Sequence, residues 1–285
     1  MTASLSTHDT ALAGLAGGAP STPTRINPLQ QWWVLTVRGL IKVLRNGEFV
    51  FAFVSPAFLA LCFYLPLRKV VAQVTDGGID YAQFLMPIIM LQSMAFVASS
   101  AAMRSAMDGH EGVHARLRVM PIPTAVPFLA RTATNFALLV VALACGLAAC
   151  LLMGWRPIPA DDDGGGGQGA VVAIVIVGVI GLLLALVADG IGLVARTPEA
   201  TSQLVAFPTL ILGMLSTGFM PLALFPEWIQ PFARNQPISQ ATKAMRGAME
   251  GTLTWNGLAP TVWWACGLAA LAVGLVAVAV RRNGR

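Results

Sequence analysis

The 285-residue sequence contains few charged side chains. They make up 11% of the chain, whereas about a quarter of the residues in a soluble domain are charged. Hydrophobic residues make up 56%, and the mean hydropathy is +0.72. A soluble globular domain is therefore excluded, and a membrane protein is indicated.

Cysteine is also scarce, and its positions form no ligand or disulfide pattern. Cys62, Cys145, Cys150 and Cys266 fall inside long apolar runs, outside any loop with the spacing of metal ligands or disulfide frameworks. We expect all four to be small packing residues.

The sequence lacks a phosphate-binding loop. That loop needs the pattern GxxxxGK followed by Ser or Thr, whereas Lys42, Lys69 and Lys243 are followed by Val, Val and Ala. The chain therefore cannot hydrolyse ATP by itself, and it needs no cofactor of its own. The remaining basic residues are arginine, which together with much Ala, Gly and Val suggests a GC-rich bacterial genome.

Apolar runs long enough to cross a bilayer occupy most of the chain. A helix needs about 20 apolar residues for this, whereas barrel strands would be about 10 residues long and alternate strictly. Only the fourth run contains a charge, Asp189. The sequence predicts an all-α polytopic membrane protein with six transmembrane helices, at 49–67, 84–103, 132–155, 170–195, 200–225 and 252–280.

The distribution of basic residues predicts the orientation, because loops rich in Lys and Arg stay in the cytoplasm. With six spans both termini share a side. Cytoplasmic termini leave six of the 18 basic residues outside, namely Arg68, Lys69, Arg156, Arg234, Lys243 and Arg246. We therefore predict a multi-pass protein of the bacterial plasma membrane with both termini in the cytoplasm.

The N-terminal region divides into two parts. Residues 1–24 contain almost no large apolar groups, so we expect a disordered tail. Residues 25–48 interleave aliphatic and basic residues, which predicts an amphipathic helix lying in the membrane interface in contact with lipid. The alternative is a basic flank that only fixes topology. The helix would place these residues at the interface: Trp32, Trp33, Arg38, Lys42 and Arg45.

Two acidic features are candidates for a functional site. The loop 161–169 has three adjacent aspartates followed by glycines, but calcium loops need carboxylates at alternating positions, so a solvated hairpin tip is the better interpretation. Asp189 is costly within a membrane, and we expect it to face the protein interior or water and to pair with a basic group such as Arg196. Both functional and structural pairing remain open.

The sharpest chemical motif is His110-Glu111-Gly112-Val113-His114, which fits the zinc-binding pattern HExxH. An intramembrane zinc metalloprotease is therefore an alternative function, with His110 and His114 as ligands and Asp189 as a possible third. Gly112 would weaken the required helix by about 1 kcal/mol. The neighbouring charges place the motif in an aqueous loop, and both observations count against the protease.

Apolar side chains suggest a substrate path. Met86, Met90 and Met94 recur every four residues, giving one deformable face that suits either irregular hydrophobic ligands or helix packing. The segment 219–237 is apolar but broken by four prolines, which favours short helices dipping into the outer leaflet over a spanning helix or an ordinary loop. We assign Asp189, Phe219, Met220 and Trp228 to the same path.

The segment between the second and third runs resembles a motif of the ABC-2 class of transporter permeases. In that family an acidic residue lies four positions before a glycine. A leucine lies five positions after the same glycine, and a Pro-apolar pair begins nine positions after it. Asp108, Gly112, Leu117 and Pro121-Ile122 occupy those positions.

A second match lies between the fifth and sixth runs. It comprises Gly-Phe-Met-Pro at 218–221, Phe-Pro-Glu-Trp-Ile at 225–229, Asn-Gln-Pro at 235–237, and Arg246. This stretch is most similar to the daunorubicin-resistance permeases and to mycobacterial relatives that export cell-envelope lipids. The resemblance covers about 29–282.

The resemblance implies a type V exporter-like fold. In such a fold, residues 25–48 would form the connecting helix and residues 49–282 would form the six-helix transmembrane domain. The proline-broken segment 219–237 would form the re-entrant helices. It also implies separate ATPase subunits that bind ATP and Mg, a second permease subunit, identical or homologous, a hydrophobic substrate and no nucleic-acid partner. A coupling helix between the second and third spans would contact the ATPase through Asp108, Glu111, Gly112, Val113, Arg116, Leu117, Arg118 and Pro121.

Three classes of function therefore compete. The first is a permease subunit that performs no bond chemistry and moves a cell-envelope lipid or lipophilic drug outward, driven by its ATPase partner. The second is the zinc protease, and the third is an ATP-independent carrier or assembly factor. Copurification of an ATPase, or of stoichiometric zinc, separates them.

Overall fold

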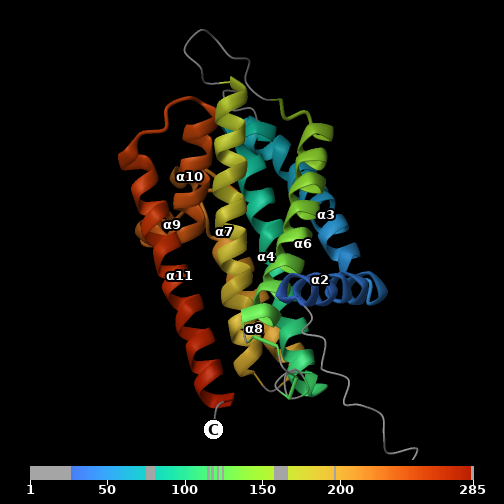
Figure 1. Ribbon diagram of the computed structural model, residues 1–285. Coiled ribbons are helices and arrows are strands. Elements are labelled where there is room, and N and C mark those ends of the chain that lie inside the picture. Colours follow the sequence, from blue (N-terminus) through green and yellow to red (C-terminus); the bar gives the residue numbers. More distant parts are fainter. Residues whose placement is uncertain are drawn as a thin grey trace, which may run out of the picture.

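The computed structural model describes residues 27–74, 81–113, 116, 119–120, 122–123, 125–156, 166–195 and 197–283. Every regular element in these ranges is helical. Figure 1 shows long helices standing side by side, with α2 lying across them in the lower half of the view. The predicted tail, 1–24, and the aspartates of the loop 161–169 lie outside the described residues.

Five helices are long and apolar enough to cross a membrane. They confirm five of the predicted spans, with ends shifted by a few residues. The largest differences are seven residues, at the ends of the first and second spans and at the start of the third, where the helices extend beyond the predicted limits of 67, 103 and 132. The helices are α3 (Glu48–Val74), α4 (Tyr81–His110), α6 (Ala125–Leu152), α7 (Gly166–Val194) and α11 (Trp255–Asn283).

The predicted fifth span, 200–225, was wrong in its second half. Helix α8 (Pro198–Met214) has 17 residues, a rise of roughly 25 Å against a hydrocarbon core of about 30 Å. The chain turns after Met214, through a segment that contains Ser216, Gly218 and Pro221. The prediction counted apolar residues and overlooked these helix-breaking groups. The six-span topology therefore stays a prediction.

Short helices fill the interval between α8 and α11. They are η1 (Leu222–Leu224), α9 (Gln230–Asn235) and α10 (Pro237–Met249). Proline stands at the start of both α9 and α10, where its missing N–H leaves no hydrogen bond unmade. The prolines thus divide the segment into short helices, as the sequence predicts, whereas insertion into the outer leaflet stays a prediction.

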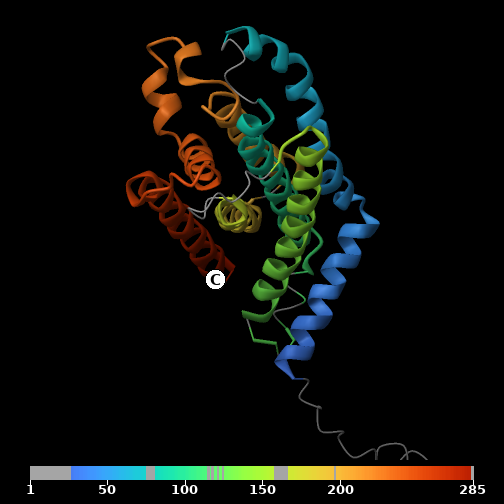
Figure 2. The same cartoon turned by 90° about the horizontal axis from the view of Figure 1, so that it is seen from above.

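Helix α4 forms the centre of the bundle. It packs against α3, α6, α7, α8 and α10, and most of its side chains are buried. The close approach of α7 depends on glycine, because a Cβ on Gly192 would collide with the carbonyl oxygen of Ala102. Figure 2 shows α4, α6 and α7 between α3 on one side and α11 on the other.

Helix α2 (Pro28–Arg45) is the amphipathic helix that the sequence predicts. The side chain of Asn27 accepts a hydrogen bond from the backbone N–H of Leu29 and caps its start. At the other end Gly47, with φ of 71°, turns the chain directly into α3. One face of α2 packs on α6, where Gly39 lies against Thr134.

Candidate functional site

Charged side chains gather inside the bundle at the end where α2 lies. They come from five helices, α2, α3, α4, α6 and α7, and the uncharged polar side chain of Asn135 lies among them. We call them the polar cluster, which comprises Lys42, Glu48, Arg104, Asp108, Arg131, Asn135 and Asp189.

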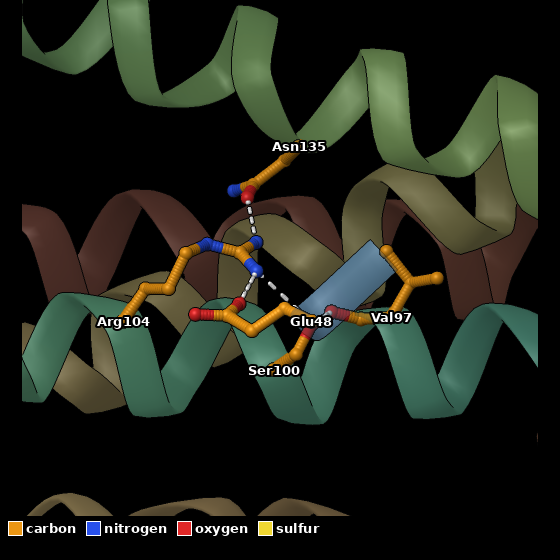
Figure 3. A network of polar contacts seen from close by, with 5 residues as sticks. All are labelled: Glu48, Val97, Ser100, Arg104 and Asn135. Carbon is orange, nitrogen blue, oxygen red and sulfur yellow. Dashed lines mark hydrogen bonds and ion pairs between the residues drawn. The ribbon is translucent and has the colours of Figure 1, made fainter. Parts of the chain in front are cut away.

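Arg104 occupies the middle of the polar cluster and is only 8% exposed. Its guanidinium donates to the carboxylate of Glu48, to Ser100 Oγ at 3.1 Å and to Asn135 Oδ1 at 2.7 Å (Figure 3). These contacts tie the start of α3 and the middle of α6 to α4. A buried charge is tolerated only when it is paired and hydrogen-bonded, and Arg104 meets both conditions.

Lys42 holds α2 against the end of α4. Its Nζ lies 2.9 Å from Asp108 Oδ1 and 3.1 Å from Glu111 Oε2. Burial by itself would lower the pKa of Lys42, but the hydrogen bonds and charges of Asp108 and Glu111 outweigh burial and raise it. The ammonium group therefore stays protonated, and the α2–α4 contact persists at neutral pH.

Asp189 lies on α7 and faces the protein interior, as predicted. Its side chain is 5% exposed, and its Oδ2 lies 3.4 Å from Arg131 Nη2 on α6. Ser105 Oγ donates to the backbone carbonyl of the same residue at 3.0 Å. The predicted type of pairing is confirmed with Arg131 as the basic group, whereas Arg196 lies outside the described residues.

Two small cavities adjoin the polar cluster. One, of about 50 Å³, has walls that include Lys42, Arg104 and Asp189, each of which belongs to a different ion pair. The other, of about 90 Å³, lies between α2 and α6 and also reaches Val113 after α4. Each has room for a few water molecules at most. The charges therefore hold helices together and do not line a passage in this conformation.

The arrangement allows force to be transmitted between helices. Lys42 and Glu48 flank the α2–α3 turn, and both contact the last turns of α4. A displacement of α4 at Asp108 would therefore act on α2 and on the base of α3 through these ion pairs, in addition to the apolar packing between the helices. The polar cluster therefore links α2 and α3 to the last turns of α4.

A second polar unit lies at the opposite end of the bundle, around Arg246 on α10. Its guanidinium donates to the carbonyl oxygens of Phe84, Thr217 and Gly218 at 2.6 to 3.2 Å. It also lies 3.7 Å from the centre of the Phe84 ring. Arg246 thus joins the start of α4 to the turn after α8.

The predicted ATPase-coupling residues lie at and beyond the end of α4. Asp108 and Glu111 face Lys42 within the chain, Gly112 has φ of 68° and ends the helix, and Arg116 is exposed. Leu117, Arg118 and Pro121 lie outside the described residues. The contact with an ATPase stays a prediction.

The zinc-protease alternative is not supported. Helix α4 ends at His110, and the positive φ of Gly112 breaks the helical turn that would bring two histidines together. His114 lies outside the described residues, and within the described ranges no group of three His, Cys, Asp or Glu side chains is placed to hold a metal.

The predicted path residues differ in exposure. Met86, Met90 and Met94 are all at most 1% exposed, and the latter two pack against glycines of α6 and α7. Phe219 is also buried, against Phe63, whereas Trp228 is 81% exposed. Of the two roles considered for the methionine face, helix packing is therefore the one that these side chains have in this conformation. Met220 is partly buried near the turn after α8.

The predicted connecting-helix residues take different positions on α2. Trp33, Arg38 and Arg45 are exposed, Trp32 is partly buried, and Lys42 turns inward to Asp108. The exposed Trp and basic groups suit a membrane interface, whereas Lys42 belongs to the polar cluster.

Sequence reasoning missed the roles of Glu48, Arg104, Arg131 and Asn135. Arg104 and Arg131 were counted only among the cytoplasmic basic residues that set the orientation, and no role was predicted for Glu48 or Asn135. A usable signal was present, because Arg104, Asp108 and Glu111 recur at helical spacing and mark one face of a continued helix.

The fold defines a polytopic helical membrane protein in which a polar cluster joins five helices, and the described residues contain no group of three His, Cys, Asp or Glu side chains placed to hold a metal. Residues 30–249 match the ABC-2 type transporter family, and the chain belongs to it.

Curated relatives agree with this membership. The chain is 34% identical over 258 residues to the doxorubicin resistance ABC transporter permease protein DrrB of Mycobacterium tuberculosis, covering 84% of this chain and 85% of that protein. It is 30% identical over 207 residues to the daunorubicin resistance ABC transporter permease protein DrrB1 of Streptomyces coeruleorubidus, covering 71% of this chain and 67% of that protein. The probable doxorubicin resistance ABC transporter permease protein DrrC of Mycobacterium tuberculosis is 24% identical over 234 residues, covering 81% of this chain and 80% of that protein.

Proposed function

We propose that this chain is the transmembrane permease subunit of an ATP-driven exporter that moves a hydrophobic molecule outward across the bacterial plasma membrane. The observation that carries the proposal is the family match over 30–249, which includes both the polar cluster and the Arg246 unit. The motor would be a separate ATPase with its own ATP and Mg, because the sequence has no phosphate-binding loop.

The polar cluster supports a route for the force. The segment after His110 would contact the ATPase on the cytoplasmic side, and its motion would reach α4 first. Asp108 and Arg104 would then pass the motion to α2 and α3 through Lys42 and Glu48. Charged contacts suit this step because their geometry is directional, so the helices move together.

The cargo is proposed as a cell-envelope lipid or a lipophilic drug. The relatives are named for resistance to doxorubicin and daunorubicin, which is a property of those proteins. The apolar character of the helices in this chain supports a cargo of the same general kind. A second permease subunit, identical or homologous, would complete the passage.

The test is purification of the tagged chain from its native membrane, followed by mass spectrometry and an ATP hydrolysis assay. We expect an ABC ATPase to copurify, and we expect Leu117→Asp to reduce both its recovery and its hydrolysis. The matched control is Leu29→Asp, an exposed change of the same kind at the far end of α2. Transport by the chain with no nucleotide-hydrolysing partner would overturn the proposal in favour of an ATP-independent carrier.

A further inference from the structure

A cavity of about 640 Å³ lies at the α10 end of the bundle. It is bordered by the turn after α8, by α10 and by the start of α11. Ser239, Thr254 and Asn256 contribute polar groups to its walls. It is several times larger than the cavities of the polar cluster and has room for a ligand group of many atoms. The proposed force route does not use it.

The walls of this cavity are strongly basic. Arg234, Lys243 and Arg246 line it, and Glu250 is the acidic residue among its lining groups. Arg246 already donates to the carbonyl oxygens of Phe84, Thr217 and Gly218. It therefore contributes positive charge to the cavity more than it contributes hydrogen-bond donors. Arg234 and Lys243 are exposed, and within the described ranges neither forms an ion pair.

Such a concentration of positive charge is unexpected at this end of the chain. On the predicted orientation it lies outside, where basic residues are normally depleted. These three account for half of the six basic residues predicted outside. Since like charges repel, an excess of two positive charges around one cavity favours an anionic occupant.

Tryptophan places the cavity at the level of lipid headgroups. Trp255 begins α11 beside the cavity residue Asn256 and is 69% exposed. Trp263 and Trp264, two turns further along the helix, are also exposed. Tryptophan gathers where the hydrocarbon meets water, so these exposed tryptophans favour a position of the cavity beside the lipid headgroups.

We infer that this cavity binds the anionic headgroup of a membrane lipid, with Arg234 and Lys243 donating to its phosphate. The cavity volume, the net positive lining and the adjacent exposed tryptophans carry this inference together. It does not rest on the proposed function, because a lipid can bind here whether or not the chain moves a cargo.

The experiment compares lipids retained by the purified full chain in detergent, using native mass spectrometry. Wild-type protein is titrated with phosphatidylglycerol and with phosphatidylcholine of the same acyl chains. We expect preferential retention of phosphatidylglycerol, and we expect Arg234→Gln with Lys243→Gln to reduce that preference by about tenfold. Arg246 is left intact because it holds the structure together.

The matched control is Arg68→Gln with Lys69→Gln. These residues are exposed on α3, line none of the cavities described above and give the same change in charge. This pair should retain the wild-type preference. An equal loss of the phosphatidylglycerol preference in both double variants would overturn the inference, and so would the absence of that preference in the wild type. If inorganic phosphate displaces the lipid while chloride at matched ionic strength does not, the site binds a free anion and the lipid assignment is wrong. Should the double variant unfold, Lys243→Gln alone provides the same comparison.

Discussion

Arg246 Nη2 donates a 3.0 Å hydrogen bond to the carbonyl oxygen of Gly218, a residue 28 positions earlier. The two residues are the end and the start of one sequence motif between the fifth and sixth predicted spans. The structure shows why they belong together. Arg246 satisfies the carbonyl oxygens that the turn after α8 leaves without a helical partner, and it ties that turn to α4 through Phe84.

Replacing Arg246 should therefore destabilise the whole end of the bundle. Arg246→Met removes hydrogen bonds to three carbonyl groups, and we expect a loss of about 3 kcal/mol in the free energy of unfolding. Thermal unfolding of the purified chain in detergent measures the effect. Arg234→Met, an exposed change on the neighbouring helix α9, should stay within about 0.5 kcal/mol of wild type. Similar melting temperatures for the two variants would contradict the structural role.

The contact between Lys42 and Asp108 should contribute to coupling more than to stability. Both side chains are partly exposed, so a double-mutant cycle of Lys42→Gln and Asp108→Asn should give a coupling energy of about 1 kcal/mol. ATP hydrolysis by the assembled complex should become insensitive to cargo in each single variant. The exchange Lys42→Asp with Asp108→Lys should restore part of that response. An exchange variant no better than the single variants would argue against a direct contact.

The pair of Arg104 and Glu48 should behave differently because it is buried. Glu48→Leu alone leaves the Arg104 charge without its carboxylate, and we expect a loss of about 3 to 5 kcal/mol. Combining it with Arg104→Leu removes both charges, so the double variant should be more stable than the single one. Expression level and melting temperature in detergent check the order. A double variant less stable than Glu48→Leu would mean that Arg104 acts mainly through Asn135 and Ser100.

Glycine at position 192 should be required for the packing of α7 on α4. A side chain there meets the backbone carbonyl of Ala102, which has no rotamer to change, so Gly192→Val should lower the melting temperature strongly. Gly267→Val on α11 is the matched control, because open space surrounds that position. Both variants carry the same β-branched side chain within a spanning helix. Equal effects would show that helix propensity, and not close packing, decides the outcome.

His110 should be dispensable. It is exposed at the end of α4, so His110→Ala should leave the melting temperature and the ATP hydrolysis of the complex at wild-type values. Elemental analysis of the purified chain should find zinc well below one atom per chain. Stoichiometric zinc that disappears in His110→Ala would revive the metal-dependent alternative.

The amino-acid sequence alone determined that this is a helical membrane protein. Apolar runs near 20 residues can cross a bilayer only as helices, since the backbone must satisfy its own hydrogen bonds there. The same logic located five long apolar helices, and the interleaving of aliphatic and basic residues located the helix before them. The motif around Asp108 and Gly112 and the motif ending at Arg246 were also sufficient to indicate the family.

Only the tertiary structure decided how the charges are used. Asp108 was predicted to face a partner, yet it lies against Lys42, because α4 continues to His110 and brings its last turns beneath α2. Glu48, Arg104 and Asn135 are far apart in sequence and belong to three helices, so no local pattern relates them. Hydropathy reports whether a segment prefers lipid, but helix packing alone determines which buried charges meet.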